Sequence, residues 1–381
     1  MSTFKELGVA DALAAALAKQ GVTEPTPIQE QALPKLFAGA NLVAQAPTGT
    51  GKTLAYLLPV LQQMDSSLPQ AQAIVLAPTY ELAMQIAGVA RELAQAAGLG
   101  IRVQGLIGGA NISRQIESLK KKPQLIVGSA GRIAELSRMH KLKLAQVNTL
   151  VLDECDRLLD DQNLDTVVEV EQLLQKAHPA PLQYMLFSAT LTKKARERAS
   201  FLDSPEEIHI EESAAELGAR ENLYQIVPFR AKIEMVRRLA RRLQVKRGLV
   251  FINRTYDAER TLMKLRYDGL SVDSLLGTRG KQQRQQAIAR FKAGKTRLLL
   301  STDLAARGLD IPDVDYVFNL DLPESAQVYL HRAGRTARAG KHGTVILLAD
   351  IKEAYKLEQL EKHLGIHLKK VPGGPKHKKK K

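Results

Sequence analysis

The 381-residue sequence predicts an α/β fold with two successive domains, each a mostly parallel β-sheet flanked by helices. Two observations support this prediction: short β-prone apolar runs alternate with helix-length segments, and the pattern occurs twice. Apolar runs of this length are typical of parallel strands that are buried on both faces. The runs lie at residues 41–46, 73–77, 125–128, 149–154 and 184–188 in the first half, and at 248–252, 297–301, 314–320 and 344–349 in the second.

An acidic stretch without such runs separates the two halves. The opening segment, with Leu7, Leu13 and Leu17, predicts an amphipathic helix that packs on the first domain. We therefore expect domain 1 at residues 1–208, a linker at 209–220, domain 2 at 221–367 and a basic disordered tail at 368–381.

The composition excludes several classes of protein. Hydrophobic residues make up 45% and charged residues 25% of the chain, which is typical of a globular protein and excludes wholesale disorder. No apolar stretch approaches the ~18 residues of a membrane helix, and the start does not resemble a signal peptide. A single cysteine, Cys155, excludes an internal disulfide framework and a cysteine-rich metal site. We expect a soluble, cytoplasmic protein.

Positive charge gathers in the second half. The formal net charge is +15, and residues 221–367 carry 27 basic and 16 acidic side chains. The tail adds seven lysines and no acid. The alternative for the tail is a solvated end without function, but lysines attract phosphate whether or not they are ordered. The distribution indicates a polyanionic partner.

A glycine-rich loop follows the first apolar run, with the sequence APTGTGKT at residues 46–53. Gly49 and Gly51 allow successive backbone N–H groups to face an anion at the start of a helix. Lys52 is placed to reach the β- and γ-phosphates and the Thr53 hydroxyl to contact Mg²⁺. Because the segment begins with alanine where the usual pattern has glycine, an ordinary glycine-rich turn remains the alternative.

Two carboxylates, Asp153 and Glu154, follow another apolar run. Carboxylates at a buried strand end are costly unless they meet a cation or transfer a proton. Asp153 suits a contact with Mg²⁺, and Glu154 suits the base that activates a water molecule. An acidic cap between a strand and a helix is the alternative. Together with the glycine-rich loop, the pair predicts a nucleoside triphosphatase.

Further segments extend this pattern into an ordered set from residue 4 to about 350. The chain resembles the DEAD-box family of ATP-dependent RNA helicases. The resemblance rests on GVTEPTPIQ (21–29), APTGTGKT (46–53), PTYELAMQ (78–85), GG (108–109), SAGR (129–132), DECD (153–156), SAT (188–190), LVFINRT (249–255), STDLAARGLDIP (301–312) and HRAGRTAR (331–338).

The resemblance implies two RecA-like domains with ATP and Mg²⁺ in the cleft and RNA across both. It implies an RNA-dependent ATPase that separates short duplexes or remodels RNA–protein complexes, and contacts with the RNA backbone rather than with particular bases. An ATP-gated RNA clamp or scaffold, in which hydrolysis only serves release, remains open, and so does a DNA helicase with the same ATPase core.

The resemblance also assigns roles to residues. For nucleotide binding it implies Phe4, Thr26, Gln29, Ala46, Pro47, Thr48, Gly49, Thr50, Gly51, Lys52, Thr53 and Asp310, with Thr53 and Asp153 at the metal. For catalysis it implies Lys52, Asp153, Glu154, Arg335 and Arg338, and for coupling to RNA it implies Asp156, Ser188, Thr190 and His331. For RNA binding it implies Pro78, Thr79, Gly109, Ser129, Arg132, Arg254, Arg284 and Thr302.

Some of these assignments have simpler alternatives. Phe4 would also suit plain packing of the first helix, and His331 a packed position near the cleft. Without the other segments, Arg335 and Arg338 would be taken for a surface cluster on a basic domain.

The chain also departs from the family pattern. Tyr80 replaces an arginine near the expected RNA path, Lys281 replaces a glutamine, and Ala337 replaces a glycine between two arginines. Cys155 stands where the signature usually has alanine, and a redox switch is the alternative to a small buried side chain there.

Overall fold

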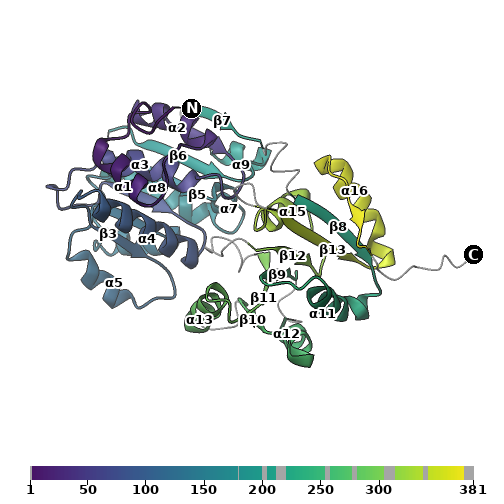
Figure 1. Ribbon diagram of the computed structural model, residues 1–381. Helices are drawn as coiled ribbons and strands as arrows, with labels where there is room; N and C mark the ends of the chain where they lie inside the picture. Colours follow the sequence, from purple (N-terminus) through teal and green to yellow (C-terminus); the bar gives the residue numbers. More distant parts are fainter. Residues whose placement is uncertain are drawn as a thin grey trace, which may run out of the picture. The chain divides into compact units, whose positions relative to one another are not determined.

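The computed structural model describes residues 2–178, 180–199, 204–211, 220–253, 258–276, 281–303, 314–337 and 342–372. The chain divides into two compact units, Met1–Glu211 and Glu212–Lys381, called unit 1 and unit 2 below (Figure 1). Within the described ranges, each unit contains a seven-stranded sheet in which all strand pairs are parallel. The predicted α/β class is confirmed.

The sheet of unit 1 has the strand order β3-β4-β2-β5-β6-β1-β7. Its strands are short, and all but β7 are largely buried, which explains why most of them read as apolar runs in the sequence. The strands are β1 (Leu42–Gln45), β2 (Ala73–Leu76), β3 (Val103–Leu106), β4 (Leu125–Gly128), β5 (Thr149–Asp153), β6 (Gln183–Ser188) and β7 (Glu206–His209).

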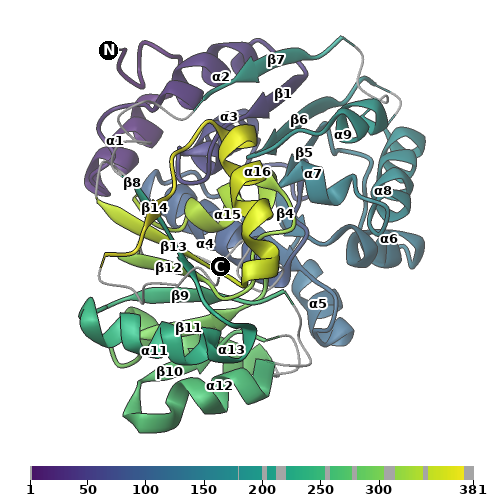
Figure 2. The same ribbon diagram turned by 90° about the vertical axis from the view of Figure 1, so that its right-hand side faces the viewer.

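Helices cover this sheet through two apolar cores. In β1, Leu42 and Ala44 belong to one core and Val43 to the other, because successive strand residues point to opposite faces. Figure 2 shows α6 and α8, which contact each other. The helices are α1 (Asp11–Lys19), α2 (Pro27–Phe37), α3 (Lys52–Gln63), α4 (Tyr80–Ala96), α5 (Ile112–Leu119), α6 (Ala130–Arg138), α7 (Cys155–Leu158), α8 (Leu164–Ala177) and α9 (Lys193–Arg198).

Unit 2 repeats the plan with the strand order β10-β11-β9-β12-β13-β8-β14. Its strands are β8 (Arg220–Ile226), β9 (Gly248–Phe251), β10 (Val272–Ser274), β11 (Leu298–Ser301), β12 (Tyr316–Asn319), β13 (Gly343–Ala349) and β14 (Lys369–Lys370). The described helices are η1 (Phe229–Ala231), α11 (Lys232–Arg242), α12 (Ala258–Arg266), η2 (Tyr267–Gly269), α13 (Lys281–Lys292), α15 (Ala326–Ala333), η3 (Ile351–Glu353) and α16 (Ala354–Leu364).

The amphipathic opening helix is confirmed as α1 for Leu13 and Leu17, which are buried while Asp11 and Lys19 are exposed, but Leu7 lies in the turn before the helix. Within the described parts of the chain, no helix has the length and apolar character needed to span a bilayer.

The predicted boundaries need two corrections. His209 lies in β7 and Arg220 in β8, so the linker is shorter than residues 209–220. The tail begins later than residue 368, because Lys369–Lys370 pairs with β8, and Leu368 and Val371 are buried. Burial of these two apolar residues stabilises the short basic strand between them. Residues 373–381 lie outside the described ranges, and the remaining domain bounds stay predictions.

Candidate nucleotide and RNA site

The glycine-rich loop connects the carboxyl end of β1 to the start of α3. Gly49 and Gly51 have φ angles of 88° and 91°, in the left-handed region that favours glycine. A Cβ atom on Gly51 would come within 2.5 Å of Gln29 Nε2, so the loop also needs glycine there for space. Thr48 lies in the same turn. The backbone therefore takes a conformation that few other sequences allow.

The side chain of Lys52 folds over this loop. Its Nζ donates hydrogen bonds to the carbonyl oxygens of Ala46 and Pro47 at 2.6 and 2.8 Å. The Thr50 hydroxyl donates to the Pro47 carbonyl at 2.7 Å. Thr53 lies in the first turn of α3. The ammonium group is thus held at the loop, where phosphate oxygens are natural replacements for the two carbonyls.

Gln29 joins the predicted adenine-sensing segment to the loop. Its Oε1 accepts a hydrogen bond from Thr26 N at 3.0 Å, and its Nε2 donates to the Gly51 carbonyl at 3.0 Å. The side chain is buried, and Thr26 caps α2. Because a primary amide carries two N–H donors, one donor of Gln29 is left for a base edge.

Phe4 packs in the apolar core of unit 1. The side chain is 4% exposed and belongs to the apolar core that also contains Leu13 and Leu33. A ring packed in this way offers no open face to an adenine. The burial favours the packing alternative, and a base contact of Phe4 stays a prediction.

Asp153 ends β5 with both carboxylate oxygens engaged. Oδ2 accepts a hydrogen bond from the Tyr56 hydroxyl at 2.9 Å, and Oδ1 accepts one from Glu154 N at 2.9 Å. Asp153 and Tyr56 are both buried. Burial raises the pKa of Asp153, and the nearby charge of Lys52 opposes that rise. The carboxylate is therefore fixed in orientation beside the lysine of the loop.

Glu154 follows in an unusual backbone conformation, with φ 51° and ψ 50°. The left-handed region costs a residue with a side chain ~1–2 kcal/mol, and such strain gathers at functional sites. The next residue, Cys155, is buried, and burial raises the pKa of its thiol well above the usual value. A thiol of this kind is a poor redox switch, so the interpretation of Cys155 as a small buried side chain is favoured.

Asp156 binds the residues with which the sequence pairs it. Its Oδ1 accepts a hydrogen bond from the Ser188 hydroxyl at 2.6 Å, and its Oδ2 accepts one from the Thr190 hydroxyl at 3.1 Å. The Ser188 carbonyl accepts a hydrogen bond from Ala46 N at 3.0 Å. These contacts connect the DECD segment, the SAT segment and the glycine-rich loop.

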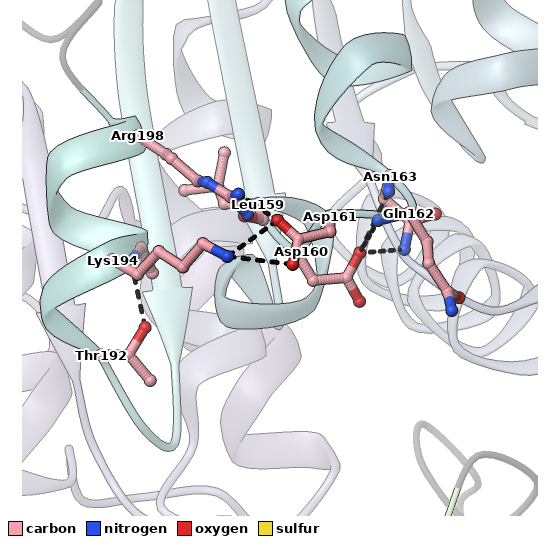
Figure 3. Close-up of polar contacts among 9 residues, drawn as sticks. Leu159, Asp160, Asp161, Gln162, Asn163, Thr192, Lys194 and Arg198 are labelled. Atoms are coloured by element: carbon pink, nitrogen blue, oxygen red, sulfur yellow. Dashed lines mark hydrogen bonds and ion pairs between the residues drawn. The ribbon is translucent and has the colours of Figure 1, made fainter.

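A second connection joins α9 to the segment after α7 (Figure 3). Lys194 Nζ lies 2.8 Å from Asp161 Oδ1 and 2.9 Å from Oδ2, and Arg198 also pairs with Asp161. Arg198 Nη1 donates to the Leu159 carbonyl at 2.7 Å. The two cations lower the pKa of Asp161 to about 2. Because α9 follows the SAT segment and Asp161 follows the DECD segment, this cluster is a second contact between the regions that follow these two segments.

The predicted RNA residues of unit 1 follow three other strands. Ser129 Oγ accepts a hydrogen bond from Gly108 N at 3.3 Å, and Arg132 Nη1 donates to the Ala110 carbonyl at 3.2 Å. Gly109 adopts a φ of 70° between these contacts. Pro78 and Thr79 follow β2, and Thr79 caps α4 by accepting from Leu82 N. The contacts bring the GG and SAGR segments together.

All these positions lie at the carboxyl edge of one sheet. The strands β3, β4 and β2 are neighbours, and so are β5, β6 and β1. In open parallel sheets, ligands bind at this edge. The edge therefore carries two adjacent groups of polar residues: the expected RNA contacts at one side and the expected nucleotide contacts at the other.

Unit 2 places the remaining predicted residues on different elements. Thr302 follows β11 and is buried, Arg284 lies on α13, and His331 lies on α15. Arg335 is 6% exposed, and its carbonyl accepts a hydrogen bond from Val314 N. The predicted residues Arg254, Asp310 and Arg338 lie outside the described ranges.

Arg332 is a central residue that the sequence interpretation missed. Its guanidinium is 1% exposed and pairs with Asp303 through Nε at 2.6 Å and Nη2 at 2.7 Å. It also donates to Asn319 Oδ1 at 2.9 Å and Asn253 Oδ1 at 2.7 Å, and lies over the Phe251 ring. One side chain thus connects the LVFINRT, STDLAARGLDIP and HRAGRTAR segments.

Both Arg332 and Tyr56 could have been found from the sequence. Arg332 falls three residues after Tyr329 on the apolar stripe of α15, where a cation requires a buried acid. Tyr56 is a hydroxyl-bearing residue in the otherwise apolar run AYLLPVL. Each is a polar group on a buried helix face. Such a position indicates that the side chain has a polar partner, but the sequence does not indicate which residue that partner is.

Comparisons with known proteins agree with this arrangement. Residues 26–198 match the DEAD/DEAH box helicase family, and residues 231–340 match the helicase conserved C-terminal domain. The chain is 41% identical to the DEAD-box ATP-dependent RNA helicase CshC of Bacillus cereus over 91% of this chain and 88% of the relative. It is 40% identical to the probable ATP-dependent RNA helicase YfmL of Bacillus subtilis over 91% of each protein.

A solved structure gives the same result. Dbp5 of S. cerevisiae, bound to RNA and ADP BeF3, superimposes with a TM-score of 0.86 at 30% identity, over 97% of this chain and 96% of that protein. With both family matches in order and relatives of this identity, the chain belongs to the DEAD-box family of ATP-dependent RNA helicases.

Proposed function

We propose that this protein hydrolyses ATP in an RNA-dependent manner and uses the cycle to separate short RNA duplexes or remodel RNA–protein complexes. The observation that carries the proposal is the shared carboxyl edge of the unit 1 sheet. There the loop with Lys52 follows β1 and the Asp153–Glu154 pair lies at the end of β5, while the Ser129–Arg132 segment follows β4, which only β2 separates from β5. The relatives of this chain are described as ATP-dependent RNA helicases, which supports the proposal.

For the nucleotide, we propose that Gln29 and Thr26 bind the adenine edge and that residues 46–53 hold the phosphates. Lys52 would exchange the carbonyls of Ala46 and Pro47 for phosphate oxygens, which its present hydrogen bonds make geometrically accessible. Asp310 is proposed for the ribose.

The residues also fit Mg²⁺. The ion prefers oxygen ligands and is held in such sites by one or two carboxylates together with substrate phosphates. Asp153 supplies a buried, oriented carboxylate, and Thr53 supplies a hydroxyl in the first turn of α3. Within the described ranges, no cluster of three or more His, Cys, Asp or Glu side chains forms a self-sufficient metal site. When bound with ATP, Mg²⁺ would neutralise charge on the transferring phosphate.

For hydrolysis, we propose that Glu154 takes the proton of the attacking water. Lys52 stabilises charge on the phosphates from unit 1, and Arg335 and Arg338 do so from unit 2. An arginine contributed in this way is worth ~10³–10⁵ in rate. Placing these arginines on a different unit from Lys52 would make hydrolysis depend on RNA drawing the units together. His331, Asp156, Ser188 and Thr190 are proposed to couple that event to the nucleotide.

For RNA, we propose backbone contacts by two sets of residues, without recognition of particular bases. The contact residues proposed are Pro78, Thr79, Gly109, Ser129 and Arg132 in unit 1, and Arg254, Arg284 and Thr302 in unit 2.

We also propose a cytoplasmic location, with which the single cysteine agrees.

The test compares strand displacement with ATP hydrolysis on the same duplex under multiple turnover. We expect displacement that requires hydrolysable ATP and stops in the Glu154→Gln variant. RNA-stimulated hydrolysis with long residence on RNA and no displacement would instead identify an ATP-gated clamp. Displacement without ATP would contradict the proposal in either form.

A further inference from the structure

Unit 2 contains a large cavity whose wall includes Asn253, one of the hydrogen-bond partners of Arg332. It has a volume of about 1220 Å³ and lies where residues following β9 and β12 meet η1, α12 and α16. We call it the α12–α16 groove. Its floor includes Ile252 and Leu320, which are buried, and its rim is formed by longer, exposed side chains.

The rim of the groove is positively charged. Arg230, Arg260, Lys264 and Lys356 line it and are exposed, and within the described ranges no ion pair is found for any of the four. The excess of cations on this rim therefore suits an anionic occupant.

The acids in the groove cancel only part of that charge. Glu353 pairs with Lys232 at 2.7 Å, and Asp321 Oδ2 accepts a hydrogen bond from Asn253 N at 2.9 Å. Glu324 is the remaining carboxylate among the lining residues. Four rim cations thus face two carboxylates, Asp321 and Glu324, for which no ion pair is found among the described residues, so an excess of positive charge remains.

Exposed aromatic rings accompany the cations. Phe229 is 64% exposed and Tyr355 is 55% exposed, and both line the groove. Within the described ranges Tyr267 is the one other exposed aromatic residue, in a chain with only 4% aromatics. A nucleic-acid base can stack on an exposed aromatic ring and remove it from water. Such stacking increases affinity by several-fold to about a hundred-fold per base.

We propose that the α12–α16 groove binds single-stranded RNA that extends beyond the segment held at the strand edges. Cations along a concave surface together with exposed rings are the features by which proteins bind single strands without sequence preference. Asn253 in the groove wall is followed directly in the sequence by Arg254, one of the residues proposed above to contact RNA. The inference rests on the proposed function, since it presumes that RNA is the substrate.

The test measures equilibrium binding of two RNAs to the full-length protein. One RNA is just long enough to saturate ATPase stimulation, and the other is extended at its 5′ or its 3′ end. The charge variant is Arg260→Ala with Lys264→Ala, and the stacking variant is Phe229→Ala with Tyr355→Ala.

Each variant has a matched control. Lys295→Ala with Arg297→Ala removes the same charge at the amino end of β11, the opposite edge of the sheet from the groove. Tyr267→Ala removes one ring, 71% exposed, outside the groove. We expect neither control to weaken binding of the extended RNA, whereas the corresponding groove variant should weaken it.

We expect both groove variants to weaken binding of the extended RNA about 10-fold and to leave the short RNA unchanged. The charge variant, which removes two cations, should also flatten the salt dependence by about 1.4 units of slope, while the stacking variant should not. Equal affinities for wild type and both groove variants would overturn the proposal and leave an acidic protein segment as the alternative occupant. A loss that is equal for short and extended RNA would overturn it as well.

The outcome is separable from that of the proposed function. If RNA fails to stimulate ATP hydrolysis by the wild-type protein, the proposed function fails. If stimulation is normal but the extension contributes no affinity through the groove, only the present inference fails.

Discussion

The hydroxyl of Tyr56 donates a hydrogen bond to Asp153 Oδ2 at 2.9 Å, from the helix that begins with Lys52. Both side chains are buried, and the Tyr56 ring lies 5.3 Å from that of Phe187. The phenol therefore links the first turns of α3 to the carboxylate proposed for Mg²⁺. It acts through Asp153 and is a positioning residue.

Replacing Tyr56 by Phe removes this hydrogen bond and keeps the ring. We expect the Mg²⁺ concentration needed for tight nucleotide binding to rise about 5- to 10-fold, because a lost hydrogen bond to a charged group is worth ~1.5–3 kcal/mol, only part of which appears in binding. The measurement is a titration of fluorescent nucleotide affinity with Mg²⁺.

The matched control is Tyr184→Phe, which removes a hydrogen bond of 3.0 Å to Glu171 on α8. That variant should lose stability without changing the Mg²⁺ titration. An identical shift in both variants would mean that Tyr56 acts only through general stability.

Replacing Glu154 by Gln keeps the size of the side chain and removes the base. We expect kcat for ATP to fall ~10²–10⁴-fold while ATP and RNA affinities stay within a few-fold of wild type. The measurement is single-turnover hydrolysis beside equilibrium binding. Glu92→Gln, an exposed change on α4, serves as the control. Normal turnover in the Glu154 variant would remove this residue from the mechanism.

Much of this arrangement was predictable because it depends on local pattern. The buried strands give unbroken apolar runs, and residues that follow them, such as Lys52, Asp153 and Ser188, are brought to one edge by parallel topology alone. Five strands were missed because none is an unbroken apolar run: β3, β7, β10 and β14 lie at the sheet edges, and β8 alternates buried with more exposed residues.

The partners of buried polar side chains were not predictable in the same way. Arg332 and Asp303 are 29 positions apart, and only the tertiary fold brings them together. Phe4 was assigned to base stacking from its position, whereas its burial depends on packing against residues far along the chain. Ala337 adopts a φ of 58°, so the methyl group that replaces a glycine sits on strained backbone.

Replacing Arg332 by Lys should destabilise unit 2 despite conserving charge. A lysine lacks the planar fork that binds both oxygens of Asp303, and breaking a buried pair costs ~3–5 kcal/mol. We discount this to about 2–3 kcal/mol, because charge is kept and the Asp303 side chain is 27% exposed. Hydrogen exchange of the β9 and β12 amides measures the change within unit 2.

An exposed change on the same unit, Arg238→Lys, should leave those amides unaffected. Unchanged protection in the Arg332 variant would show that the buried guanidinium is not the connection between these strands.

The Asp161 cluster predicts a pH effect. Because Lys194 and Arg198 lower the pKa of Asp161 from 3.8 to about 2, its contribution to stability is present above pH ~4 and is lost as the pH falls toward 2. Carboxyl carbon chemical shifts should report this low value directly. Arg198→Ala should return it toward 3.8, whereas the pKa of Asp65, which Ser67 lowers, should stay unchanged. An ordinary pKa for Asp161 in the wild-type protein would mean that the pairs do not persist in solution.

The most direct measurement of the central claim is ATP hydrolysis by the full-length protein with no nucleic acid, with single-stranded RNA and with DNA of the same sequence. The residues for phosphate and metal lie in unit 1 and the two proposed arginines belong to unit 2, so we expect slow hydrolysis alone and strong stimulation by RNA but not DNA. Fast hydrolysis without nucleic acid, or equal stimulation by DNA, would contradict the account.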